Sequence, residues 1–362
     1  MNAANSSVAA HLTVPGTKIE EWLDAGQCRD CFLPSFGYRP GGSAQYALAL
    51  SNFDKNGAPT RFKWGFIASS DNHRARAGTG YKPIDRLRQT EAVRVSGQWR
   101  PRIFPKGDPI AETYVIDPEL LINLGFAATE MERQASFWTT GGLAAVHSRG
   151  RSRDAIFDAL ERRETYGTSG PRILLWFNTV DGTPMGGTVR TDKGPVFEVK
   201  AVGAHKQKPG CPEDTLDLLG AKRVQKLCAN ECYNPSDERL RITRIEIVRI
   251  RPQITPDERV DGLIDDPWMV HKCPANGKGC SFTFSDPAFA EGERMATYYA
   301  RAIQEPTERI NADNLRCTYD AEGNCLKVNM CYGDDRTAAS DECTRPVEER
   351  AWSSPIFVEY RN

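Results

Sequence analysis

The stretch KWGFIASSDNH (residues 63–73) joins an apolar run to a polar end that carries Asp71 and His73. Apolar side chains occupy both faces of residues 61–68, a pattern typical of a parallel strand covered on each side. In α/β sheets and barrels, functional side chains gather at the carboxyl ends of such strands. If the chain stays extended there, Asp71 and His73 lie on one side and can share a divalent metal. The alternative is that Asp71 caps a turn and His73 is a loop histidine.

A second short apolar run, residues 143–146, leads directly into His147. Arg149 and Arg151 follow, and a helix is predicted over residues 152–164 with Ser152 as its cap. A histidine and arginines near a helix amino terminus suit an anionic group such as phosphate or carboxylate. We take His147 and Arg149 as the catalytic candidates, with Arg151 as a further anion contact. A solvated basic loop is the alternative.

Further helices are predicted over residues 18–25 and 43–50, and after Asp117, where Pro118 suits a first helical turn. From residue 171 onward the pattern changes to two-residue alternation, which indicates strands in a β-sandwich with long loops. The strand candidates are residues 172–177, 196–202, 244–250, 296–303 and 355–360.

Composition narrows the possible partners. Lys and Arg number 47 against 48 for Asp and Glu, which argues against a dedicated nucleic-acid-binding protein. No apolar run approaches the roughly 20 residues needed to span a bilayer. The expected partner is a small anionic substrate, on the basis of His147 and the arginines that follow it, and the oligomeric state stays open.

The chain has 11 cysteines, and all but Cys28 and Cys31 lie from Cys211 onward. Such clustering favours disulfides formed in an oxidising compartment, periplasmic or extracellular, although the amino terminus does not read as a signal peptide. The spacing of the later cysteines is uneven and their number is odd, so their pairing stays open. Cys28 and Cys31 are interpreted as a disulfide or structural pair, with a metal site or a redox pair as alternatives.

Several stretches resemble a known family. GFIASSDNH (residues 65–73) is similar to an Asp-x-His motif of the PHP (polymerase and histidinol phosphatase) superfamily of metal-dependent phosphoesterases. Residues 141–173 and 349–358 resemble a bacterial PHP-like family of unknown function, and residues 28–50 and 76–82 resemble one branch of it. The resemblance covers most of residues 20–180 and the last dozen.

The resemblance implies a (β/α) barrel hydrolase with a metal cluster at the carboxyl ends of its strands. It makes Asp71 and His73 ligands of a divalent metal such as Zn, Mn or Fe. The chain departs from the family because it contains no His-x-His, the motif with which PHP sites begin. We therefore expect the carboxyl-terminal part of a longer protein, with an incomplete metal site and no activity of its own.

These observations give one combined expectation for fold and function. Residues 1–170 form part of a PHP-like α/β barrel, and residues 171–362 form a disulfide-rich, all-β accessory domain whose last strand, 354–360, packs on the barrel. The intact protein is expected to be a metal-dependent hydrolase of a phosphoester or a related ester or amide. The alternative is a secreted, non-catalytic binding or structural protein.

Overall fold

The computed structural model describes residues 44–53, 59–69, 78, 80–89, 142–275, 279–310, 312, 318–321, 325–327, 338 and 340–361. The helical elements are α1 (Ala44–Ala49), α2 (Arg86–Gln89), α6 (Arg153–Glu161), α7 (Glu213–Leu219), α8 (Ala221–Cys228), the 3-10 helix η4 (Val260–Leu263) and α9 (Ala288–Gly292). The strands are β1 (Leu143–Val146), β2 (Thr165–Thr168), β3 (Leu174–Thr179), β4 (Thr188–Thr191), β5 (Val196–Val202), β6 (His205–Gln207), β7 (Pro235–Arg239), β8 (Ile242–Ile250), β9 (Ile264–Lys272), β10 (Cys280–Ser285), β11 (Ala296–Arg309), β12 (Thr318–Tyr319), β13 (Cys325–Lys327), β14 (Arg345–Ser353) and β15 (Ile356–Tyr360). Among these residues, no helix is long and apolar enough to cross a membrane.

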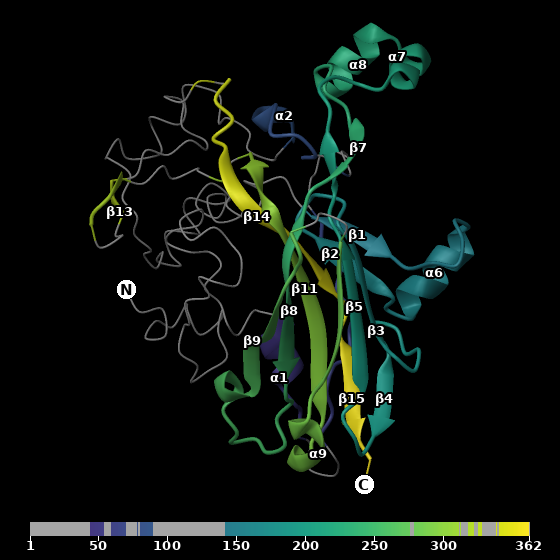
Figure 1. Cartoon of the computed structure of the whole chain (residues 1–362), viewed down its shortest axis with the longest axis vertical. Helices are drawn as coiled ribbons and strands as arrows, with labels where there is room; N and C mark the ends of the chain where they lie inside the picture. Colours follow the sequence, from purple (N-terminus) through teal and green to yellow (C-terminus); the bar gives the residue numbers. More distant parts are fainter. Residues whose placement is uncertain are drawn as a thin grey trace, which may run out of the picture.

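Strand β11 is the centre of the larger sheet (Figure 1). It pairs along one edge with β8, and along the other with β14 and then β15, always antiparallel. Pro355 separates β14 from β15, and a proline cannot donate a hydrogen bond to a strand ladder. Beyond these strands, β9 pairs with β8, and β2 pairs with β14 and carries β1 on its other edge. Strand β4 runs parallel to β15. The described strands of this sheet number eight.

A smaller antiparallel sheet, β10-β5-β3, packs on one face of the larger one. Strand β5 alternates exposed and buried residues, as expected for a strand with one face in a core. The shared core takes Phe177, Val199 and Phe284 from the small sheet, and Ile247 and Tyr298 from the large one. The two sheets therefore form a β-sandwich.

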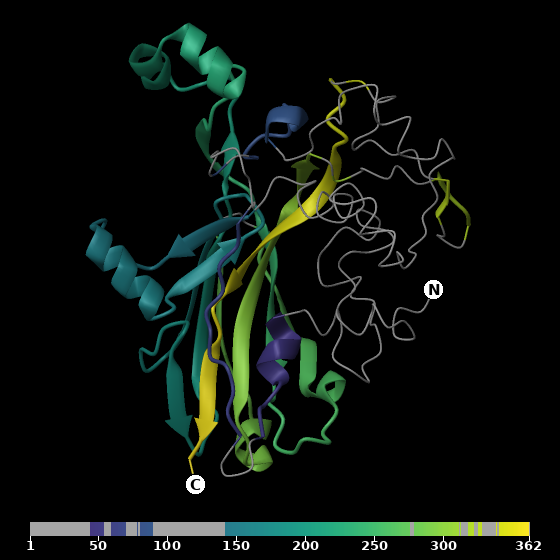
Figure 2. The same ribbon diagram turned by 180° about the vertical axis from the view of Figure 1, so that it is seen from behind.

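The opposite face of the large sheet carries a second apolar cluster. Tyr46 and Leu48 of α1 pack against Tyr299 of β11, and Trp64 and Phe66 join them from residues 59–69. This segment is extended and runs over the sheet surface (Figure 2). Both faces of β11 are thus covered, one by the small sheet and one by chain that precedes residue 70.

Two hydrogen bonds hold Phe66 of the extended segment in place, and a third joins the two residues that make them. The Phe66 amide donates to Ser354 Oγ (2.8 Å), the Thr165 hydroxyl donates to the Phe66 carbonyl (2.9 Å), and the Ser354 amide donates to the Thr165 carbonyl (2.9 Å). A Cβ on Gly65 would lie 2.8 Å from both Arg163 Cβ and Ser354 Oγ, so only glycine allows this close approach. The segment is fixed by side chains and by contact with the sheet, without forming a strand of it.

The α/β barrel prediction is wrong. The described residues form no closed barrel, and β1 pairs antiparallel with β2 instead of taking part in a parallel unit. Residues 61–68 form no strand, and the side chains of Phe62 and Ile67 are 71% and 65% exposed. The last strand was predicted to pack on the barrel. Strand β15 instead lies in the large sheet, between β11 and β4.

Several individual elements are confirmed. Helix α1 falls within the predicted residues 43–50, and α6 begins after Ser152, whose side chain accepts a hydrogen bond from the Ala155 amide. Strands β3, β5, β8, β11 and β15 overlap the five predicted strands, and β11 extends six residues beyond its prediction. In α6, Ala159 is buried, whereas Ile156 and Leu160 are exposed.

Two predicted helices, over residues 18–25 and after Asp117, lie outside the described residues. The division at residue 170 stays a prediction, because much of the chain before residue 142 is not described. Strands β1 and β2 nevertheless join the same sheet as β14, which lies near the carboxyl terminus.

We predict that Glu359 makes stability depend on pH. Hydrogen bonds from Lys63 and Arg190 lower the pKa of the Glu359 carboxyl, although burial opposes them, and the Lys63 contact fastens the extended segment to β15. A lowered pKa gives stability that is complete above about pH 4.5 and is lost as the pH falls through the folded-state value. Glu359→Gln should therefore destabilise the protein near pH 7 by roughly 0.5–1 kcal/mol, and the difference should shrink in acid.

Urea unfolding of both proteins between pH 7 and pH 3 measures this difference. Glu238→Gln, at an exposed ion pair with Lys206, is the matched control and should change little at any pH. A difference for Glu359→Gln that stays constant or grows in acid would contradict the prediction.

Candidate functional site

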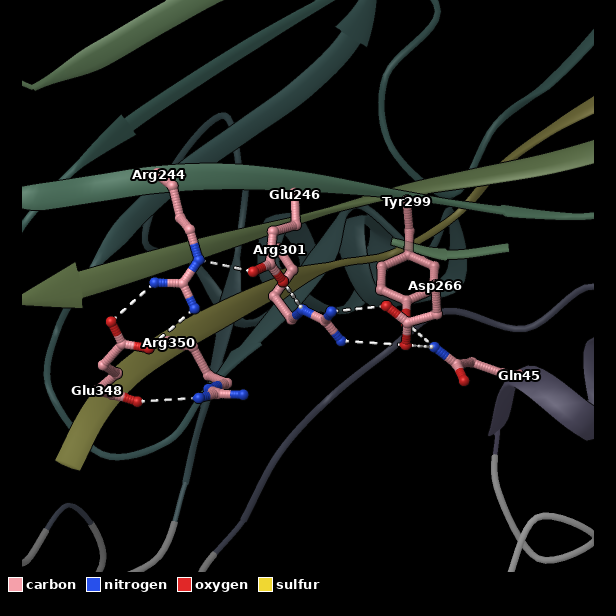
Figure 3. Close-up of polar contacts among 8 residues, drawn as sticks. All are labelled: Gln45, Arg244, Glu246, Asp266, Tyr299, Arg301, Glu348 and Arg350. Atoms are coloured by element: carbon pink, nitrogen blue, oxygen red, sulfur yellow. Dashed lines mark hydrogen bonds and ion pairs between the residues drawn. The ribbon is translucent and has the colours of Figure 1, made fainter. Parts of the chain in front are cut away.

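Two groups of charged side chains are candidate sites. The first, the Arg301 network, lies on the face of the large sheet that carries α1 (Figure 3). The Arg301 guanidinium, 2% exposed, donates to Glu246 (2.6 Å) and to both carboxylate oxygens of Asp266 (2.6 and 3.2 Å). Gln45 of α1 donates to Asp266 and to the Tyr299 hydroxyl, each at 2.6 Å. The network thereby connects α1 with β8, β9 and β11.

The network continues toward β14. Arg244 donates to Glu246 (2.7 Å) and, with two nitrogens, to Glu348 (2.7 and 2.8 Å). Arg350 donates to the Glu348 carbonyl (3.2 Å), and burial together with the charge of Arg301 lowers the pKa of its guanidinium to about 10. Arg350 therefore stays charged at neutral pH. Three arginines face three carboxylates, so the network has no excess charge to offer a ligand, and we interpret it as structural.

The second group surrounds a cavity of about 430 Å³, the Lys82 pocket. Lining residues Glu231 and Tyr233 stand between α8 and β7, and these two elements lie together at one end of the molecule (Figure 1). The pocket walls come from residues 80–84, residues 170–172, strand β6, the chain before β7 and the end of β11. Apolar lining residues are Pro83, Ile84, Pro171, Pro209, Leu240 and Ile310.

Lys82 holds the pocket walls together. Its side chain is 8% exposed and donates to the Gly210 carbonyl (2.8 Å) and to Glu231 (2.5 Å). The Gly210 amide donates to the same Glu231 oxygen (2.8 Å). Burial disfavours the Glu231 carboxylate, but these hydrogen bonds outweigh it and hold its pKa below the usual value. The charge of Lys82 is thus neutralised inside the wall.

An aromatic and cationic wall faces the same cavity. The rings of Tyr81 and Tyr233 meet edge to face, with centroids 5.8 Å apart. The Arg172 guanidinium carbon lies 3.7 Å above the Tyr233 ring centroid, a cation–π contact. The guanidinium is therefore held over the ring at the cavity.

The other charges of the lining are mostly paired. Arg309 donates to Glu349 (2.6 Å), and Lys206 forms an exposed pair with Glu238 (3.0 Å). Within the described part of the chain, Arg172 and Lys208 have no carboxylate partner, and Glu308 is the lining carboxylate without a cation. The Nδ1 atom of His205, also in the lining, is buried without a hydrogen-bond partner among the described residues. The unpaired lining charge is therefore mainly positive.

The residues predicted from the sequence lie elsewhere. Asp71 and His73 are outside the described residues. His147 Nε2 donates to the Leu175 carbonyl (2.8 Å), and its ring packs against Tyr166 and Trp176, so its role here is in packing. Arg149 and Arg151 are exposed in the turn before α6, and neither they nor His147 line the pocket.

Sequence reasoning missed the residues of the pocket. Tyr81 and Lys82 belong to a stretch that had been singled out only for its family resemblance, and Arg172 had been assigned to a strand. Tyr233 follows a cysteine in a loop. No spacing connects these positions, because the fold brings them together from distant parts of the chain.

The disulfide prediction gains partial support. Cys211 pairs with Cys232 and Cys273 with Cys280, and Cys343 is also disulfide-bonded. Cys228 is a free thiol. Cys28 and Cys31 lie outside the described residues.

Comparison with known proteins adds one match. Residues 50–183 match the model of a family described as "Protein of unknown function (DUF3604)". The matched region includes the extended segment, β1, α6, β2, β3 and the pocket residues before β3. No curated protein and no solved structure matches the chain. The family description names no activity, so the resemblance to the PHP superfamily stays a prediction.

We predict that Arg301 is essential for stability. Replacing it with alanine leaves the buried carboxylates of Glu246 and Asp266 without their cation, and breaking a buried pair in this way costs about 3–5 kcal/mol. Arg190→Ala is the control, because Arg190 is 78% exposed in its pair with Glu359 and its loss should cost no more than about 1 kcal/mol. Urea unfolding at pH 7 measures both, and equal losses would refute the structural role of the network.

Proposed function

We propose that the protein binds a small organic anion with an apolar body in the Lys82 pocket. The observation that carries this proposal is Arg172, whose guanidinium lies over the Tyr233 ring at the cavity without a carboxylate partner in the described chain. A cavity of about 430 Å³ is in the range of small-molecule sites.

The chemistry of the lining supports this ligand class. A guanidinium donates two parallel hydrogen bonds to a carboxylate or phosphate, and stacking on a ring reduces the freedom it must lose on binding. Lys208 adds a second cation at the exposed side of the cavity. Tyr81, Ile84 and Leu240 offer contacts to an apolar or aromatic body. The ligand would place its anionic end at the mouth and its apolar end inside.

Arg172→Ala tests this proposal by calorimetric titration with 4-nitrophenyl phosphate. We expect the aryl phosphate to bind more tightly than inorganic phosphate or 4-nitrophenol alone. Loss of the charged hydrogen bonds of Arg172 should weaken binding by about 10- to 100-fold. Arg172→Lys keeps the charge but loses the planar stack and should give an intermediate value.

Arg190→Ala, a surface substitution outside the pocket, is the control and should leave the affinity unchanged. Arg172→Ala with the affinity of the wild type would rule out this binding site.

We further propose that the bound anion is the substrate of a metal-dependent hydrolase. Asp71 and His73 precede Gly78 and Gly80 in the sequence, and both glycines line the pocket. The alternative, a non-catalytic binding protein, is favoured by the pairing of Glu231 and Glu349 with cations, which leaves neither free as a general base. Catalysis would therefore depend on Asp71 and His73.

Titration with Mn²⁺ tests the metal ligands. Two protein ligands hold a metal weakly, so we expect weak Mn²⁺ binding that Asp71→Ala or His73→Ala abolishes, and no turnover of 4-nitrophenyl phosphate by this chain. Unchanged Mn²⁺ binding in both variants would remove these residues from the site. Turnover that depends on Asp71 would instead show that the site is complete.

We also propose that the protein works in an oxidising compartment, periplasmic or extracellular. The disulfides Cys211–Cys232 and Cys273–Cys280 support this location, since cytosolic proteins seldom keep such bonds.

A further inference from the structure

Three cysteine sulfurs meet next to the Lys82 pocket, and we call them the thiol triangle: Cys211, Cys228 and Cys232. Cys211 and Cys232 form a disulfide, and Cys228 is a free thiol that is partly buried beside it. Cys228 Sγ lies 3.0 Å from Cys232 Sγ and 3.8 Å from Cys211 Sγ. All three sulfurs lie within 4.8 Å of one another.

The three sulfurs do not form the line that thiol–disulfide exchange requires. In a linear array the two distances from Cys228 would differ by a full S–S bond, about 2 Å. Here 3.0 and 3.8 Å differ by much less, so Cys228 lies at the side of the disulfide. This arrangement is unfavourable for attack on Cys232, but it matches three ligands that face one centre.

We propose that reduction of Cys211–Cys232 converts the thiol triangle into a site for one thiophilic metal ion, with Zn²⁺ as the reference ion. Zn–S bonds of about 2.3 Å in a tetrahedral site place neighbouring sulfurs about 3.8 Å apart. Cys228 and Cys211 already have this separation. The other two pairs reach it by separating by less than about 2 Å once the disulfide is broken.

The reduction has a defined balance. A dithiol gives two electrons and two protons to the Cys211–Cys232 disulfide, becomes a disulfide itself, and leaves two thiols on the protein. Zn²⁺ then binds three thiolates and displaces three protons, and the fourth position is open to water. In the oxidised form two of the three sulfurs are bonded to each other, so the same ion finds no site.

The backbone that presents the sulfurs is fixed by contacts other than the disulfide. The Cys232 amide donates to the Gly210 carbonyl (3.3 Å), which also accepts from Lys82. The Gly210 amide donates to Glu231, next to Cys232. Cys228 ends helix α8, and Ala229 and Asn230, both with positive φ, return the chain toward Cys211. The sulfurs therefore stay close together after reduction, as a metal site requires.

The test compares zinc binding by the full chain and by Cys228→Ser, each reduced with a phosphine that does not compete for metal. Cys228→Ser keeps the native disulfide and therefore serves as a folded starting point. Other cysteines bind equally in both proteins, so the difference reports the triangle. We expect the reduced wild type to bind one more Zn²⁺ than the variant, or to bind it at least about tenfold more tightly. Co²⁺ in place of Zn²⁺ should give a stronger thiolate-to-metal absorption band in the wild type.

A Cys273→Ser/Cys280→Ser double variant is the matched control, because it removes the other described disulfide and should keep the extra zinc. A Cys211→Ser/Cys232→Ser variant, which leaves one thiol, should lose it. Equal zinc content and equal Co²⁺ absorption in reduced wild type and Cys228→Ser would overturn the proposal, as would the same extra zinc in the oxidised wild type. This outcome is independent of anion binding in the pocket, which is measured with the oxidised protein.

Discussion

The Arg301 guanidinium lies between Glu246 of β8 and Asp266 of β9, with almost none of its side chain exposed. These three charged groups must be buried in contact with one another, because burying any one of them without a partner would cost much free energy. A one-residue shift of β8 or β9 would turn its carboxylate to the other face of the sheet and leave Arg301 with only one of its two partners. The ion network therefore fixes the register of three central strands, and through Gln45 it also fixes where α1 lies.

The two faces of β11 illustrate how much of the fold could be predicted. Its alternation places Tyr298 in the sandwich core and Tyr299 in the cluster under α1, and the period of two was sufficient to locate this strand and four others. The same pattern carries no information on which strands are neighbours. The barrel prediction failed at residues 61–68, where apolar side chains on both faces were interpreted as a buried strand. The segment instead lies on the sheet through Trp64 and Phe66, and the contacts that hold it come from Thr165 and Ser354, far away in sequence.

The candidate site was harder to predict for a related reason. Histidines and aspartates at strand ends are easily predicted as catalytic residues or metal ligands, because these residue types often have such roles. His147 was predicted as a catalytic residue for this reason. Its ring nitrogen is used by a backbone carbonyl, which no local pattern could reveal. The pocket depends on Arg172 and Tyr233. Nothing in the sequence connects these two residues, and only the fold places the Arg172 guanidinium over the Tyr233 ring.

Charge pairing within the pocket limits what a ligand can contact. Glu231 neutralises Lys82 and Glu349 neutralises Arg309, so these cations stabilise the walls and are not available to an anion. The Cys211–Cys232 disulfide links residues adjacent to Gly210 and Glu231, so a covalent bond reinforces the wall that Lys82 already holds. Because the disulfide and the Lys82 hydrogen bonds both constrain this wall, the Tyr81 and Tyr233 rings can hold fixed positions before a ligand binds. The electrostatic attraction is then left to Arg172 and Lys208, and this division of roles is the reason for proposing an anion with an apolar body as the ligand instead of a bare inorganic ion.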